Sequence, residues 1–332
     1  MFFRNLAKSA WVRWLDLLHA RYHIDGLFFS VGWWHRGTLE LPLVQLGEAT
    51  ELELAPLATG ENTRVLRFLS PFHHLLPEQS TVAEALLVLP LEWTLETPIC
   101  IQLASTGDEG FATRRELVAE PLLRDGIGSI IVENPYYGSR RPARQQRTYL
   151  RTVSDLWAMG LSVVAETRAL LHWLKRQGFQ NLGVVGVSMG GAMDSQAPSL
   201  TPFHLAMCSC IAPHCASGVF LEGVLSRYVD FAALGGERGR ARLREQLDGS
   251  DLSLFPQPRR GDCAIWLAAR KDAYVSPESS LRAWEIWPGS HLRWLNNGHI
   301  GTAMFHRNDY LKGIRESFRR LQLSLQLPTG FP

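Results

Sequence analysis

Ser188 stands at the centre of Gly186-Val187-Ser188-Met189-Gly190, a G-x-S-x-G motif that follows an apolar run and precedes a helix-like stretch. In this context the serine occupies a strained turn between a strand and a helix, and the two glycines leave room for close backbone approach. The turn presents the hydroxyl, and the helix N-terminus directs N–H groups at a developing oxyanion. The alternative is a glycine-rich packing turn, so the motif needs partners to predict a nucleophile.

A serine hydroxyl is a weak nucleophile unless a histidine takes its proton and an acid orients that histidine. With this motif the partners follow in the order serine, acid, histidine, on loops after later strands. Asp272 follows the apolar run 263–269, and His299 follows the run 291–297. We therefore predict a catalytic set of Ser188, Asp272 and His299.

Other acids and histidines are less well placed for these roles. Asp262 precedes its predicted strand, and Asp194 lies about one and a half helical turns beyond the serine. His291 begins a strand, and His306 falls inside the predicted closing helix. None of the four is expected on a turn after a late strand, where the partners belong.

An oxyanion hole requires two backbone N–H donors. One is expected from Met189, directly after the nucleophile, and the other from the loop after the strand at 97–104. That loop reads STGDEGF, which makes the Asp108 amide the predicted second donor, with Gly107 close to it. The alternative is an ordinary turn before a helix.

A basic loop follows the next apolar run, in the stretch ENPYYGSRRPARQQRTYLR. Loops after parallel strands open at the edge where ligands bind. Arginines there can hold a phosphate or carboxylate of a substrate, although a solvated basic face is the alternative. The residues assigned to substrate binding on this basis are Tyr136, Tyr137, Arg140 and Arg144.

The chain from about residue 97 alternates short apolar runs with helical stretches, the longest of them from 154 to 177. Continuous apolar strands between helices predict a mostly parallel, doubly wound sheet covered on both faces. Before it, the segments 50–57, 64–71 and 84–93 predict antiparallel strands. The sequence therefore predicts a fold of the α/β class.

Two further parts of the chain depart from this rhythm. Residues 211–260, rich in glycine, proline and charge, predict an inserted cap or lid, with a charged connector as the alternative. Residues 1–50 form a helical, aromatic extension in front of a domain at 51–332. Trp11, Trp14 and Leu18 recur at helical spacing among basic residues, which indicates a helix packed on the domain; peripheral docking on a membrane surface or a transit-like role are the alternatives.

Composition excludes several classes of protein. The 332 residues are 46% hydrophobic and 20% charged, with a net charge of +2, so a large core is possible and nothing indicates a nucleic-acid partner. No apolar run reaches the length of a membrane span, and no secretory signal is recognised. Five cysteines without disulfide or zinc spacing favour a reducing compartment and no metal. We expect an intracellular protein without a cofactor, soluble or peripherally membrane-associated.

Several longer stretches make the chain resemble the α/β-hydrolase domain-containing protein 18 family. They cover roughly residues 65 to 320 in order, and ENPYYG is more specific than the serine motif. The resemblance implies an α/β-hydrolase fold, hydrolysis of lipid esters, and Ser188, Asp272 and His299 in its triad. The stretches are FLSPFHHLLP, LASTGDEGF, ENPYYGSRRP, VSDLWAMG, ETRALLHWL, GVSMGGAM, CASGVFLEGVLS and NNGHIGTAM.

The sequence therefore predicts a serine hydrolase that cleaves carboxylic esters, of a small molecule or a lipid, through an acyl-enzyme intermediate. A non-catalytic binding or scaffold protein on the same fold is an alternative. A serine peptidase or amidase is a second one, because the same residues can cleave amides.

Overall fold

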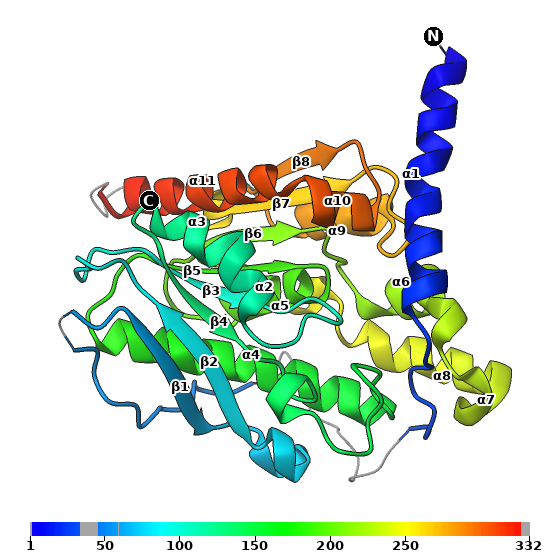
Figure 1. Cartoon of the computed structure of the whole chain (residues 1–332), viewed down its shortest axis with the longest axis horizontal. Helices are drawn as coiled ribbons and strands as arrows, with labels where there is room; N and C mark the ends of the chain where they lie inside the picture. Colours follow the sequence, from blue (N-terminus) through cyan, green and yellow to red (C-terminus); the bar gives the residue numbers. More distant parts are fainter. Residues whose placement is uncertain (1, 34–45, 59, 327–332) are drawn as a thin grey trace.

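One eight-stranded sheet organises the chain in the computed structural model, which describes residues 2–33, 46–58 and 60–326 (Figure 1). The strand order is β1-β2-β4-β3-β5-β6-β7-β8. The first two strands are antiparallel to their neighbours, and the pairs from β4 to β8 are parallel. The strands are β1 (Thr63–Leu69), β2 (Val82–Val88), β3 (Ile99–Leu103), β4 (Gly128–Val132), β5 (Leu182–Val187), β6 (Ala206–Cys210), β7 (Ala264–Ala269) and β8 (His291–Leu295).

Helices cover both faces of the sheet, as the continuous apolar strands require. On one face α4 (Val153–Arg176), α5 (Met189–Ser199) and α9 (Pro277–Ile286) share a core with Ile130 and Val132 of β4. On the other, α11 (Arg307–Gln326) packs against β6 and β7, and the short helices α2 (Ala112–Arg114) and α3 (Glu120–Leu123), joined by the π-helical turn Arg115–Ala119, lie beside it. Alternate residues of one strand thus reach opposite cores.

The predicted class is confirmed, whereas one of the predicted lead-in strands is wrong. Residues 50–57 form no strand, although Leu52, Leu54 and Leu57 pack on the core as their apolar character requires. The carbonyls of Ala55 and Pro56 accept hydrogen bonds from Arg64 instead of a ladder partner. Proline has no N–H to donate to a strand, so the alternating pattern alone was misleading here.

The segment between β6 and β7 forms a small helical unit at the carboxyl edge of the sheet, beside α1 (Figure 1). Phe220, Leu243 and Leu247 lie in its core, which also takes Phe28 and Phe29 from the N-terminal part of the chain. The backbone of Phe28 pairs with Val229 in a parallel bridge. The helical segments are α6 (Ala216–Leu221), η6 (Val224–Tyr228), α7 (Phe231–Leu234), α8 (Gly236–Asp248) and η7 (Leu252–Leu254).

Helix α1 (Phe2–His23) passes the carboxyl edge of the sheet, and its N-terminal half projects beyond the rest of the molecule (Figure 1). Asp16 and Ala20 are fully buried against the body, whereas Trp14 is half exposed. The side chains before Val12, including Trp11, lie outside the described residues, so membrane contact through this segment stays a prediction. Within the described residues, none of the helices combines the length and apolar character needed to cross a membrane.

Candidate active site

Ser188 occupies a strained turn between β5 and α5, with φ 56° and ψ −116°. A Cβ added at Gly186 would lie 2.2 Å from the carbonyl carbon of Gly190, and one added at Gly190 would lie 2.6 Å from the Leu103 carbonyl oxygen. Helix α5 therefore lies so close to β5 and to the end of β3 that only glycine fits at these two positions. The turn places Ser188 at the carboxyl edge of the sheet.

Two loops from later strands bring a histidine and an acid to this serine. His299 opens the short helix α10 (His299–Phe305) after β8, and its Nε2 lies 3.0 Å from Ser188 Oγ. Its Nδ1 lies 2.7 Å from Oδ2 of Asp272, which follows β7. The other Asp272 oxygen accepts the amides of Tyr274 and Val275, each at 2.8 Å. The structure thus brings the three predicted residues into one hydrogen-bonded chain, the arrangement needed for nucleophilic acyl transfer.

The alternative acids and histidines lie elsewhere. Asp262 pairs with Arg260 before β7. Asp194 is enclosed within α5, where burial raises the pKa of its carboxyl well above the usual value. His306 is not inside the closing helix as predicted: it follows α10 and its Nδ1 lies 2.8 Å from Asp309. His291 begins β8, as expected.

The loop after β3 differs from the prediction in its second oxyanion donor. The Asp108 amide donates to the Ser105 carbonyl at 3.2 Å, closing a turn in which Gly107 has φ +87°. The Asp108 carboxylate points to Arg114 at 2.7 Å, and the residue does not line the pocket. Met189, Thr106 and Gly107 do line it, and Thr106 Oγ1 lies 3.7 Å from Met189 Sδ. The assignment of Asp108 is corrected, because its amide already serves the turn.

Two buried ionisable side chains, Arg114 and Glu133, anchor this loop from behind. Arg114 donates to the Gln102 and Val132 carbonyls at the ends of two strands. Glu133 accepts the amide of Gly110. Burial raises the pKa of Glu133 to about 7, against the opposing effect of the Arg114 charge. The loop position therefore depends on groups that do not face the pocket.

The basic loop after β4 is also placed differently from the prediction. Arg140 is 1% exposed and forms a forked ion pair with Glu166 of α4 at 2.7 and 2.9 Å. Tyr136 and Tyr137 are buried, Arg144 is exposed, and none of the four residues lines the pocket. Sequence spacing could not show that the chain turns inward here, where Arg140 meets the buried carboxylate of a distant helix.

A pocket of about 640 Å³ opens above Ser188 and His299. Of the described residues lining it, two carry a permanent charge, Glu109 and Arg147, and the Arg147 guanidinium lies 3.0 Å from Asp25. The remaining wall is mostly apolar and comes from the N-terminal segment, α4, α5 and the helical unit between β6 and β7. Its apolar and aromatic members include Ile24, Phe28, Leu156, Trp157, Met193, Val219, Phe220, Leu225, Leu247 and Ile300.

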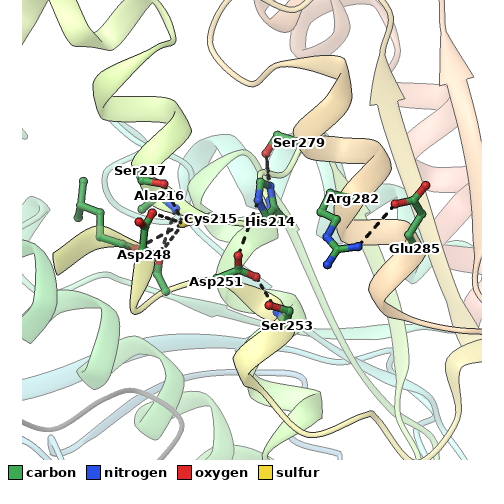
Figure 2. A network of polar contacts seen from close by, with 12 residues as sticks. His214, Cys215, Ala216, Ser217, Asp248, Asp251, Ser253, Ser279, Arg282 and Glu285 are labelled. Carbon is green, nitrogen blue, oxygen red and sulfur yellow. Dashed lines mark hydrogen bonds and ion pairs between the residues drawn. The ribbon is translucent and has the colours of Figure 1, made fainter. Parts of the chain in front are cut away.

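A polar network fixes the part of this wall that follows β6. Figure 2 shows His214 against Ser279 of α9, with Nδ1 2.7 Å from the serine Oγ. The neighbouring Cys215 is surrounded by Ser217 and the end of α8, with its Sγ 3.4 Å from the Leu247 carbonyl. Burial raises the pKa of Cys215 and lowers that of His214, so both are neutral wall residues near neutral pH.

Asp16 is a residue near the site that the sequence analysis did not single out. Its carboxylate lies beside the loops that carry Asp272 and His299 and accepts three of their backbone amides. A signal was present, because Asp16 is the sole acidic residue among positions 1–24, within an apolar and basic stretch. A lone carboxylate in such a stretch needs a partner if it is buried.

Fold and site together define a protein of the α/β-hydrolase class. The chain belongs to the family described as "Alpha/beta hydrolase domain containing 18", which matches it over residues 61–248 and 235–320. This confirms the family resemblance found in the sequence.

Several solved structures have a similar fold. An acetyl xylan esterase from Paenibacillus sp. R4 is 14% identical, with 82% of this chain and 90% of that chain covered and a TM-score of 0.59. An acylaminoacyl peptidase from Pyrococcus horikoshii is 12% identical over 83% of this chain and 44% of that chain, with a TM-score of 0.58. An esterase from Pyrococcus furiosus is 14% identical over 78% and 92%, with a TM-score of 0.53. At these identities the likeness concerns the fold.

Gly186→Ala tests the close approach at the serine turn. Because the new Cβ would contact Gly190 at 2.2 Å, we expect the free energy of unfolding in urea to fall by about 1–3 kcal/mol. Gly218→Ala in α6 is the control, since a Cβ there meets nothing within 4 Å, and it should be neutral or stabilising by up to about 1 kcal/mol. Equal stability of both variants would contradict the packing argument.

Glu133→Gln tests the buried acid behind the loop after β3. The pKa of Glu133 is raised in the folded protein, so the folded state holds the proton while the unfolded state releases it. The free energy of unfolding should therefore fall as pH rises from about 4.5 to 7, by about 1–3 kcal/mol from this group. The variant should flatten this pH dependence in urea titrations. Glu48→Gln, at an exposed position, should leave it unchanged.

Proposed function

We propose that this protein is a serine hydrolase that cleaves carboxylic esters with an apolar, lipid-like acyl group through an acyl-enzyme intermediate. One observation carries the proposal: the hydrogen-bonded chain from Ser188 through His299 to Asp272 lies at the floor of an apolar pocket. Family membership is consistent with hydrolysis.

The geometry suggests how the reaction proceeds. Ser188 Oγ attacks the ester carbonyl while His299 Nε2 takes its proton, and the alcohol leaves with that proton. Asp272, held by two backbone amides, accepts the Nδ1–H of His299 and so directs Nε2 at the serine. Water then attacks the acyl-enzyme by the same proton route and releases the acid.

Backbone amides stabilise the oxyanion in this proposal. Met189 is the first residue of α5, and an amide at this position has no partner within its helix. In the loop after β3, the Asp108 amide closes the turn. The Gly107 backbone is engaged as well: burial raises the pKa of Tyr137, and a hydrogen bond from Gly107 opposes that effect. We therefore assign the second donor to Thr106, which lies next to Met189 on the pocket wall.

The acyl group is assigned to the apolar part of the pocket. A volume of about 640 Å³ is typical of sites that enclose a drug-sized ligand. Burial of each additional methylene is worth about 0.8 kcal/mol, so an apolar wall favours longer acyl groups. Arg140 and Arg144 take no part, because Arg140 is committed to Glu166 and neither residue lines the pocket.

Labelling with a fluorophosphonate probe tests the nucleophile. We expect the wild type to be labelled and Ser188→Ala to be unlabelled. Asp272→Asn should lower ester turnover by about 10⁴-fold, because the histidine loses its orienting acceptor. Asp262→Asn is the matched control and should remain within a factor of two of the wild type. A wild type that is not labelled at neutral or mildly alkaline pH contradicts the proposal.

A series of nitrophenyl esters from acetate to dodecanoate tests the acyl pocket. We expect kcat/KM to rise with chain length in the wild type. Val219→Trp, which fills the wall formed by α6, should lower kcat/KM for the longest ester about tenfold or more and leave acetate nearly unchanged. The control Val65→Trp, on the exposed edge strand β1, should show the wild-type profile. Equal losses for short and long esters would remove the acyl assignment.

A further inference from the structure

The carboxylate of Asp16 connects α1 with the loops after β7 and β8. It is 0% exposed. Its Oδ2 accepts the amide of Ala273 at 3.0 Å and the amide of His299 at 2.9 Å, and its Oδ1 accepts the amide of Ile300 at 2.9 Å. One side chain thus joins the residue after Asp272 to the residue that carries the imidazole.

The surrounding backbone is shaped to admit this carboxylate. A Cβ added at Gly298 would lie 2.8 Å from Asp16 Oδ2 and 2.9 Å from the Val12 carbonyl oxygen. The glycine directly before His299 therefore lets α1 approach the loop. The first amides of a helix lack intrahelical partners, and here the carboxylate supplies acceptors for the first two residues of α10.

A second contact from α1 reaches the same loops. His19, about one helical turn after Asp16, places its Nδ1 3.0 Å from the hydroxyl of Tyr274. The Tyr274 ring packs against the ring of His299 with centroids 4.8 Å apart, and the Tyr274 amide donates to Asp272. Helix α1 therefore supports both the acid loop and, through Tyr274, the histidine ring.

The energetics favour a positioning role for this contact. Burying a carboxylate removes it from water, and burial raises the pKa of Asp16 against the opposing effect of the three amides. Removing the side chain would leave three amides without their acceptor and free two loops that come from different strands. A displacement of about 1 Å in a reacting group is enough to cost about 100-fold in rate.

We propose that Asp16 is a positioning residue, which fixes the Asp272 loop and the His299 loop relative to each other so that the imidazole is held between Asp272 and Ser188. This inference rests on the proposed hydrolase function. Asp16 precedes the part of the chain that matches the family, which begins at residue 61.

The test compares Asp16→Ala and Asp16→Asn with the control Arg13→Ala, an exposed position on the same helix. We expect Asp16→Ala to lower kcat for a butyrate ester about 100-fold with KM within a factor of three, because ground-state binding does not depend on the imidazole. The kcat of Asp16→Asn should lie between those of Asp16→Ala and the wild type, since the side-chain amide oxygen can still accept a hydrogen bond. Arg13→Ala should equal the wild type. A role in folding alone predicts lower stability with unchanged kcat per folded molecule.

A spectroscopic readout separates this inference from the proposed function. The proton shared by His299 Nδ1 and Asp272 should give a far-downfield proton NMR signal that Asp272→Asn removes, whether or not the protein turns over an ester. We expect Asp16→Ala to abolish or broaden this signal and Arg13→Ala to keep it. If the wild type is not labelled by fluorophosphonate but the signal depends on Asp16, the function fails and the positioning role stands.

Two outcomes overturn the positioning role. The first is folded Asp16→Ala with wild-type kcat and an unchanged downfield signal. The second applies where Asp16→Ala does not fold: the decision then rests on Asp16→Asn, and wild-type kcat with an unchanged signal in that variant contradicts the proposal. A reduced kcat and an altered signal in folded Asp16→Asn support it.

Discussion

The close approach of β5 and α5 at Gly186 and Gly190 is the constraint on which the site depends. Because the two backbones nearly touch, the residue between them must turn sharply, and Ser188 takes a positive φ that L-residues rarely adopt. Its hydroxyl is thereby fixed at one point on the carboxyl edge of the sheet. Every other group of the site has to be brought to that point.

Because of the strand order, the loops that carry two of those groups start far from the serine. β6 lies between β5 and β7, and β8 lies beyond β7, so the loops carrying Asp272 and His299 start two and three strands from the serine. Neighbouring strands are about 4.8 Å apart, which places the loop origins roughly 10–15 Å away. The contacts of α1 hold both loops from outside the sheet, and the helical unit between β6 and β7 forms part of the pocket wall beside them.

The sequence predicts the part of this arrangement that depends on local pattern. Continuous apolar runs mark the parallel strands, and polar turns after them mark Asp272 and His299, because the carboxyl ends of parallel strands share one edge. Long-range contacts are not visible in the same way. Nothing in the pattern around Arg140 shows that this loop residue pairs with Glu166, which lies in α4.

Contacts within a turn are equally hidden from the sequence. Asp108 follows a strand as an oxyanion donor should, yet its amide is used to close the turn with Ser105.

Asp16 lies far from every motif in the chain and is brought to the site by the packing of a helix. A residue that binds backbone amides of another segment leaves no motif in the sequence, because those amides are present whatever the side chain of the partner residue is.

Three features around Ser188 are unfavourable for the stability of the fold, and they favour catalysis over a scaffold role. A binding module on this fold requires the apolar wall, but it has no need for a serine in a strained conformation, which costs about 1–3 kcal/mol. It also has no need for two buried carboxylates, Asp272 and Asp16, each of which must be compensated by backbone amides. All three features converge on the surroundings of Ser188 Oγ. A strained serine, with buried carboxylates on or against the loops that carry its partners, is expected where a site is reactive.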